Sequence, residues 1–157
     1  MDESDAKEIC RWCYEPPYSL YNMDGNEECI EELTSNSYYT VKDEEGKLIG
    51  FYCFGETAQV PLGNKYGAYD DNSFIDIGLG MKPEFCGQGL GYDFILNEIE
   101  FAKKLFSNDK IRLTVADFNK RAIKVYEKAG FKYVMDFDRV TEEGVIKFII
   151  MKLSHLK

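Results

Sequence analysis

Three glycines at alternate positions, Gly87, Gly89 and Gly91, form the pattern in this sequence that best indicates chemistry. Alternate glycines let the backbone approach a ligand closely and turn its N–H groups outward. A helix that begins directly after such a turn adds partial positive charge at its N-terminus. The spacing therefore predicts a binding site for an anion.

Two predicted elements must position this turn. Before it, apolar residues at every second position predict a half-buried strand: Ile75, Ile77, Leu79 and Met81. After it, apolar residues at helical spacing predict a helix: Ile95, Ile99, Ala102 and Phe106. The turn thus joins the end of a strand to the start of a helix.

The nature of the anion can be narrowed by comparing known phosphate-binding patterns. A dinucleotide fingerprint reads Gly-x-Gly-x-x-Gly directly after a strand, and a Walker loop ends in Gly-Lys-Ser/Thr. Neither fits the stretch from Pro83 to Gly91, which reads Gly-x-Gly-x-Gly after a Pro-Glu-Phe-Cys lead-in. This stretch resembles motif A of the GNAT superfamily of acetyl-CoA-dependent N-acetyltransferases. A glycine-rich turn without a ligand is the alternative.

A second stretch, Asn119 to Phe131, resembles another signature of that family, Asn-x-x-Ala-x-x-Leu/Tyr-Tyr-x-x-x-Gly-Phe. The resemblance covers about residues 35 to 151. It implies an α/β (α+β) fold in which helices flank a mixed, mostly antiparallel sheet that is splayed at the cofactor site. The family fold usually begins with a strand, whereas this chain opens on a predicted helix. Either that edge strand is missing or the helix begins later than predicted.

The remaining pattern predicts one domain spanning residues 1–157. Helices are expected at 3–13 and from 25 to about 33, followed by a hairpin of strands at 38–41 and 48–54. A long connection over 57–72 precedes the central strand. Beyond the central helix we expect a strand at 110–115, a helix capped by Asn119 and ended by Gly130, and strands at 131–137 and 145–151.

The resemblance implies acetyl-CoA as co-substrate, and we expect no metal. Its implied cofactor contacts are Leu79, Met81, Cys86, Gly87, Gln88, Gly89, Leu90, Gly91, Asn119 and Tyr126. Backbone N–H groups of Leu79 and Met81 would bind pantetheine and the thioester oxygen, as an oxyanion hole does. Cys86 stands where the family prefers Arg or Gln, so we expect weaker cofactor affinity rather than lost function. Capping alone would also explain Asn119.

Acetyl transfer needs an amine that has lost its proton and a proton for the leaving thiolate. The only histidine, His155, lies in a polar tail, which argues against a histidine base. Asp76 is the first candidate base because it faces away from the apolar side of its strand; an aspartate pKa of about 4 would require a water chain or a raised pKa. The alternatives are a purely structural Asp76, or Glu56 or Glu84 as base.

Tyr126 matches the family tyrosine that protonates or hydrogen-bonds the leaving sulfur. A phenol with a reference pKa of about 10 keeps its proton at neutral pH and can donate it. The alternative is a core tyrosine on an apolar helix face.

The first 32 residues hold ten acidic residues against two basic ones, a net charge of −8, together with Trp12, Tyr14, Tyr18 and Tyr21. In the family this segment borders the acceptor site. The composition suits a cationic amine held by carboxylates and ring faces. Alternatively, the aromatic residues only pack the loop down. The choice between a peptide N-terminus, a lysine, a polyamine and an aminoglycoside is left open.

The whole chain carries a net charge of −9, which argues against nucleic acid as a partner. Residues 119–132 carry +4 and suit a local polyanion such as a nucleotide diphosphate, or form a solvated helix face. No apolar run reaches the length of a membrane span, and five cysteines agree with a reducing compartment. We expect a cytoplasmic monomer or homodimer.

Together these patterns predict an N-acetyltransferase. It would move an acetyl group from acetyl-CoA to the primary amine of a small molecule or peptide, by direct attack in a ternary complex. One alternative is a non-catalytic acyl-CoA sensor of the same fold. The other is an interaction module in which the glycine turn is only structural.

Overall fold

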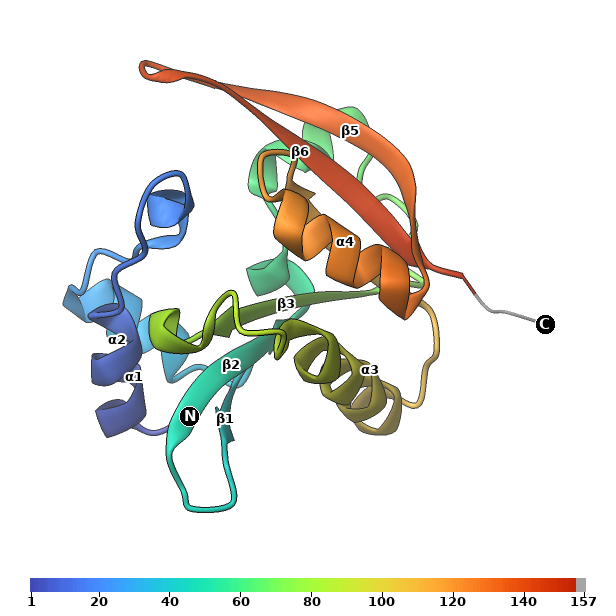
Figure 1. The fold of residues 1–157 in the computed structure, drawn as a ribbon. Coiled ribbons are helices and arrows are strands. Elements are labelled where there is room, and N and C mark those ends of the chain that lie inside the picture. The colour runs from blue at the N-terminus through green and yellow to red at the C-terminus, as the bar shows by residue number, and fades with distance from the viewer. Residues whose placement is uncertain (155–157) are drawn as a thin grey trace.

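The computed structural model describes residues 1–154, and a six-stranded sheet forms its centre (Figure 1). The strand order is β1-β2-β3-β4-β6-β5; β3 and β4 run parallel, and all other neighbours are antiparallel. The predicted mixed, mostly antiparallel sheet is thus confirmed. The strands are β1 Tyr38–Lys42, β2 Leu48–Phe54, β3 Ile75–Met81, β4 Ile111–Ala116, β5 Phe131–Thr141 and β6 Gly144–Leu153.

Four α-helices and four short 3-10 helices complete the described chain. The α-helices are α1 Glu3–Cys10, α2 Glu27–Leu33, α3 Gly91–Phe106 and α4 Lys120–Ala129. The 3-10 helices are η1 Tyr18–Tyr21, η2 Gly55–Ala58, η3 Pro61–Tyr66 and η4 Pro83–Phe85. The connection expected over residues 57–72 therefore contains part of η2 and all of η3.

The first helix and the last two strands differ in length from the pattern-based expectation. Of the two alternatives for the start of the fold, the structure agrees with the first: within residues 1–154 no strand precedes α1. The first helix ends at Cys10 rather than at residue 13. The last two strands continue past their apolar runs to a tight turn at residues 142–143, because hairpin pairing holds even their exposed tips in register.

The two faces of the sheet pack against different helices because successive residues of a strand point to opposite sides. In β2, Tyr52 and Phe54 pack in one core with α3, while Phe51 and Cys53 pack in another with α1 and α2. Figure 1 shows α3 and α4 together and the α1–α2 pair apart from them. The segment after η3 covers the β4–β6–β5 part of the second face, where Tyr69 packs with Phe137.

Helix α4 begins and ends where its sequence predicts. The Asn119 side chain accepts a hydrogen bond from the Ala122 N–H at 3.2 Å, which satisfies an otherwise unpaired donor of the first turn. At the other end Gly130 has a φ of 107°, a left-handed conformation that favours glycine.

The sheet splits between its two parallel strands. Residues Ile75–Ile77 of β3 pair with Ile111–Leu113 of β4, and no pairing between these strands continues beyond that point. Strand β3 goes on to Met81 paired with β2, and β4 goes on to Ala116 paired with β6. The two strands therefore diverge and leave the expected splay in the middle of the sheet.

Candidate active site

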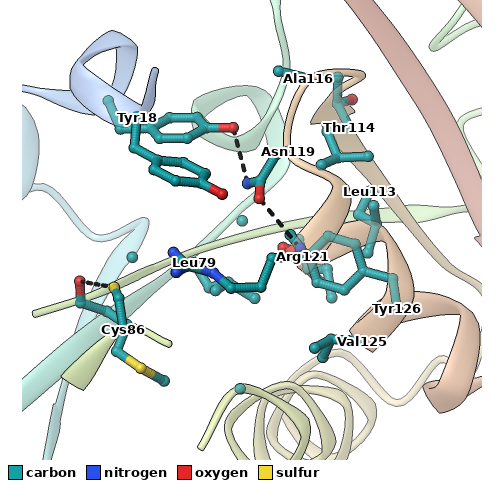
Figure 2. Close-up of a pocket in the computed structure, with 18 of the residues that line it drawn as sticks. Tyr18, Leu79, Cys86, Leu113, Thr114, Ala116, Asn119, Arg121, Val125 and Tyr126 are labelled. Atoms are coloured by element: carbon teal, nitrogen blue, oxygen red, sulfur yellow. Dashed lines mark hydrogen bonds between the residues drawn. The ribbon is translucent and has the colours of Figure 1, made fainter. Parts of the chain in front are cut away.

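A cavity of about 770 Å³ fills the splay between β3 and β4. On one side it is bordered by the glycine turn, the start of α3 and the exposed face of α4. On the other side it is bordered by Ile9 of α1 and by aromatic residues of β1, β2 and residues 12–21, which include η1; we call this the acceptor side. Figure 2 shows β3, the start of α4 and the η1 loop converging on this cavity.

The ladder between β2 and β3 directs the backbone of Leu79 and Met81 toward the cavity. Lys82 donates its N–H to the carbonyl of Ile49 at 2.8 Å, so these two form a hydrogen-bonded pair of the antiparallel ladder. Such pairs alternate along the strands, which leaves Leu79 and Met81 with their N–H and C=O groups pointing away from β2. The Tyr14 hydroxyl donates to the Met81 carbonyl at 2.7 Å, as this geometry requires.

Within the splay, the N–H and C=O groups of Leu79 and Met81 have no partner in β4. The Leu79 and Met81 N–H groups therefore form a rigid donor pair at the cavity wall, and both residues line the cavity. Donors fixed in this way can stabilise negative charge that develops on a carbonyl oxygen.

The glycine turn has the backbone that an anion site needs. Gly87 and Gly89 have φ values of 75° and 78°, and α3 begins at Gly91. These three glycines and Cys86 line the cavity. Gln88 and Leu90 are not among the lining residues: the Gln88 amide donates to the Glu84 carbonyl, and 45% of the Leu90 surface is exposed. Gln88 and Leu90 can therefore contact the cofactor only through their backbone groups.

Arg121 of α4 brings a guanidinium to the glycine turn. A Cβ placed on Gly87 would lie 3.1 Å from an Arg121 Nη atom, so the cation lies directly against the turn. The guanidinium also lies 4.7 Å from the centre of the Tyr18 ring. Figure 2 shows this side chain extending across the cavity toward Tyr18 and Cys86. Lys124 and Lys128 line the same wall.

Arg121 was not singled out from the sequence, although it lies in the basic segment 119–132. The signal that could have found it is its place in the first turn of a helix that follows the second family signature. The structure supplies a cation from α4 close to the position where Cys86 replaces the family's Arg or Gln.

Cys86 itself is half-buried and has the geometry of a thiol donor. Its sulfur lies 3.6 Å from the Met81 carbonyl oxygen and 3.7 Å from that of Lys82. Burial raises the pKa of the Cys86 thiol, and the Arg121 charge only partly offsets this. At neutral pH the side chain therefore adds no negative charge to the anion site.

Tyr126 and Asn119 both line the cavity from α4. Figure 2 shows the Tyr126 ring pointing from the helix toward the residues around Asn119 and Arg121. Burial raises the pKa of the Tyr126 phenol, with nearby Glu98 adding to the effect, so the phenol keeps its proton. The Asn119 amide caps α4 and also donates to the Tyr21 hydroxyl at 3.2 Å, which ties the η1 loop to α4.

The structure does not bring Asp76 to this cavity. Asp76 is 3% exposed, and its carboxylate accepts two hydrogen bonds from Arg112, at 2.7 and 2.8 Å, and one from Gln59 at 2.8 Å. The Asp76 carboxylate is thus held in a buried ion pair and does not face the cavity, because Arg112 lies opposite Asp76 in the neighbouring strand.

The two other candidate bases also lie elsewhere. Glu56 borders a second hollow beside the first residues of β3, together with Asp76. Glu84 forms an exposed ion pair with Lys82 at 2.8 Å. Of the described residues that line the main cavity, none is an aspartate or a glutamate.

The aromatic residues expected near the acceptor do line the cavity, namely Trp12, Tyr14, Tyr18 and Tyr21. The acidic residues of the same segment do not. Asp5 and Glu8 of α1 pair with Lys42 and Lys82, and the α2 carboxylates lie on the exposed surface: Glu27, Glu28, Glu31 and Glu32. Among the described residues, an amine in the cavity would therefore contact ring faces and no carboxylate of this segment.

Three further observations concern other kinds of site. Residues 1–154 contain no group of three His, Cys, Asp or Glu side chains arranged to hold a metal ion. None of the helices in this range has both the length and the apolar content to cross a bilayer. His155 lies outside the described residues.

Comparison with known proteins agrees with this geometry. The profile of the acetyltransferase (GNAT) family matches residues 4–131. The spermine/spermidine N(1)-acetyltransferase of Bacillus subtilis (strain 168) is 27% identical over 131 residues, which are 82% of each chain.

Solved structures show the same fold. A spermidine N-acetyltransferase SpeG chimera from Vibrio cholerae and hSSAT aligns with a TM-score of 0.71 at 20% identity, covering 98% of this chain and 92% of that one. The dodecameric spermidine N-acetyltransferase from Vibrio cholerae gives a TM-score of 0.67 at 20% identity, over 98% and 90% of the two chains. With the family profile covering most of its length, the chain belongs to the GNAT acetyltransferase family and is an acetyl-CoA-dependent N-acetyltransferase.

Proposed function

We propose that this enzyme acetylates a primary amine that approaches from the acceptor side while acetyl-CoA occupies the glycine-turn side. One observation carries the proposal. Tyr126 and the free N–H groups of Leu79 and Met81 border one cavity, which is continuous from the glycine turn to the acceptor side. Both substrates can therefore meet in a single ternary complex, without a covalent acyl-enzyme.

The residues present fit acetyl-CoA. The backbone of Gly87 and Gly89, the start of α3 and the Arg121 guanidinium form a cationic cradle suited to a pyrophosphate. The splayed edge of β3 offers hydrogen-bonding groups for the amides of the pantetheine arm. Acetyl-CoA supplies the activated acetyl group.

The protein residues then have separate tasks in the transfer. The amine nitrogen attacks the thioester carbonyl carbon, and the N–H groups of Leu79 and Met81 stabilise the negative charge on its oxygen. As the C–S bond breaks, the Tyr126 hydroxyl gives its proton to the sulfur. The surplus proton of the new amide nitrogen passes to water, and water returns a proton to Tyr126.

The amine must lose its own proton before it attacks. No carboxylate of the described chain lines the cavity, so we propose that the free base is selected from solution rather than made by a side chain. Arg121, Lys124 and Lys128 favour this, since positive charge and burial both disfavour the ammonium form.

We propose that the acceptor is a cationic amine. The Bacillus relative acts on spermine and spermidine. A cationic amine would be attracted by the acidic surface of α1 and α2, which flanks the acceptor side. We keep the proposal of a monomer or homodimer, which light scattering on the purified protein can test.

Calorimetric titration with acetyl-CoA, followed by mass spectrometry of products from an amine panel, tests this function. The panel contains a peptide N-terminus, lysine, spermidine, an aminoglycoside and a simple alkylamine. We expect binding of acetyl-CoA and equal amounts of free CoA and N-acetylated amine. Binding without any N-acetylated product would support the sensor alternative. Absence of binding would support a purely structural glycine turn.

A further inference from the structure

The acceptor side of the cavity is a box of aromatic rings, formed by Trp12, Tyr14, Tyr38 and Phe51. Phe51 is its centre, with its ring centroid 6.4 Å from that of Trp12 and 5.8 Å from that of Tyr38. Gly80 of β3 adds no side chain, and a Cβ there would collide with the Phe51 ring. This side of the cavity therefore offers the acceptor mainly apolar surface.

The two hydroxyl groups of the box are engaged with protein groups, whereas the buried Trp12 Nε1 is a donor without a hydrogen-bond partner within residues 1–154. The Tyr14 hydroxyl donates to the Met81 carbonyl at 2.7 Å, and the Tyr38 hydroxyl donates to a Glu32 carboxylate oxygen at 3.2 Å. Burial raises the pKa of both phenols, so neither becomes an anionic partner for a cation at neutral pH. The four residues of the box thus carry no negative charge, and the Glu32 carboxylate beside it already accepts from Tyr38.

The charged residues that line the cavity are all cationic within the described chain: Arg121, Lys124 and Lys128. None of the α1 and α2 carboxylates lines the cavity: Asp5 and Glu8 pair with lysines, and Glu32 contacts the box only through the Tyr38 hydroxyl. A second ammonium group carried into the cavity would lose its hydration and find no counterion. Burying an unpaired charge in this way is strongly unfavourable.

We infer that the acceptor is a monoamine with an apolar alkyl or aryl body, whose single amino group reaches the thioester while its body lies in the aromatic box. This inference rests on the proposed transfer and narrows its acceptor class. Ring faces attract one ammonium group during entry. They offer nothing comparable to the paired carboxylates that a polyamine needs at each of its charges.

A matched pair of substrates tests the inference. n-Hexylamine and 1,5-diaminopentane have chains of equal length and differ in whether the far end is a methyl or an amino group. We expect kcat/KM for n-hexylamine to exceed that for 1,5-diaminopentane by at least about tenfold, because only the diamine buries a second charge. 2-Phenylethylamine should behave as n-hexylamine does, and spermidine as the diamine does.

A variant of the cavity wall tests the physical reason. Ala58 lines the cavity next to Gly78, so Ala58→Asp places a carboxylate on the acceptor side. We expect this change to reduce the preference for n-hexylamine at least about tenfold. The matched control is Val140→Asp, the same added charge at a site that is 77% exposed and outside the lining, which should leave the preference unchanged.

The outcomes separate this inference from the function on which it rests. Equal efficiency for the two alkyl substrates, or a preference for 1,5-diaminopentane or spermidine, overturns the inference and leaves the transfer intact. No release of free CoA with any of the four amines, while acetyl-CoA binds, counts against the proposed transfer. The wild-type comparison stands alone if Ala58→Asp does not fold.

Discussion

Asp76 of β3 and Arg112 of β4 form a doubly hydrogen-bonded ion pair one residue before the two strands stop running side by side. The pair is almost fully buried, and the next residues along each strand, Ile77 and Leu113, make the final β3–β4 contact before the strands diverge. The Asp76–Arg112 pair therefore closes the base of the splay that holds the cavity. We propose a structural role for Asp76 on these grounds.

The first prediction is that Asp76→Asn changes stability and not the chemistry. Loss of the carboxylate leaves the Arg112 charge buried and without its partner, which lowers the free energy of unfolding by about 3–5 kcal/mol. Urea denaturation at pH 7 measures this. The control is Asp136→Asn: its ion pair with Lys147, 3.4 Å long, is exposed and screened by solvent, so the free energy of unfolding should change little. A stable variant with an altered pH–rate profile would instead identify Asp76 as the base.

The second prediction concerns pH and follows from the cavity lining. Without a carboxylate base, log kcat/KM should rise with a slope of about 1 between about pH 6 and 9, as the free-base fraction of the amine grows. Burial raises the pKa of Tyr126 above the ordinary value of about 10, so the donor keeps its proton. We therefore expect no decrease in kcat at any pH below about 10. A plateau that begins near neutral pH would reveal a base on the enzyme.

The third prediction separates backbone strain from ligand binding. Gly89→Ala and Gly46→Ala both place an alanine at a left-handed φ, 78° and 83°, with no atom within 4 Å of the new Cβ. Each should lower the free energy of unfolding by about 1–2 kcal/mol. Only Gly89→Ala should also weaken acetyl-CoA binding, by about tenfold, which calorimetry can measure. Equal affinities for the two variants would remove the glycine turn from the cofactor site.

Sequence periodicity was sufficient to predict β3, α3 and α4, because their apolar residues repeat with the spacing of the element. The glycine turn could also be predicted, because its pattern lies within a few consecutive residues. Asp76 was assigned to the wrong surroundings, since its partner Arg112 lies 36 positions away and depends on the parallel register of β3 and β4. Alternation alone shows that a side chain points away from the apolar face of a strand. It does not show which residues that side chain contacts.

Composition had a similar limit in the first 32 residues. It showed that acids and aromatic rings occur together, and the aromatic residues do line the cavity. The fold then points these rings inward and the carboxylates outward. Such a division depends on how α1 and α2 pack on β1 and β2, which residue counts cannot reveal.

The fourth prediction concerns Glu98 of α3, which is fully buried and has no hydrogen-bond partner for either carboxylate oxygen within residues 1–154. Burial raises its pKa well above the ordinary value, so the folded state holds a proton that the unfolded chain loses as pH rises. Its contribution to stability is thus fully present below about pH 4 and is lost with rising pH.

Glu98→Gln removes this titration. The free energy of unfolding of the variant, relative to wild type, should therefore increase steadily from about pH 4 to pH 8. Denaturation at several pH values tests this, with Glu100→Gln on the exposed face of the same helix as control. A pH-independent difference would show that Glu98 is ionised in the folded protein.

The most direct test of the account is the Tyr126→Phe variant, because Tyr126 is the proposed donor at the point of transfer. Acetyl-CoA affinity by calorimetry and kcat by thiol release are measured on the same preparation. We expect kcat to fall about 10²–10⁴-fold with affinity nearly unchanged. The control Tyr133→Phe, at a tyrosine that is 58% exposed on the edge strand, should alter neither. Equal losses of kcat and affinity, or no loss of kcat, would contradict the proposed role.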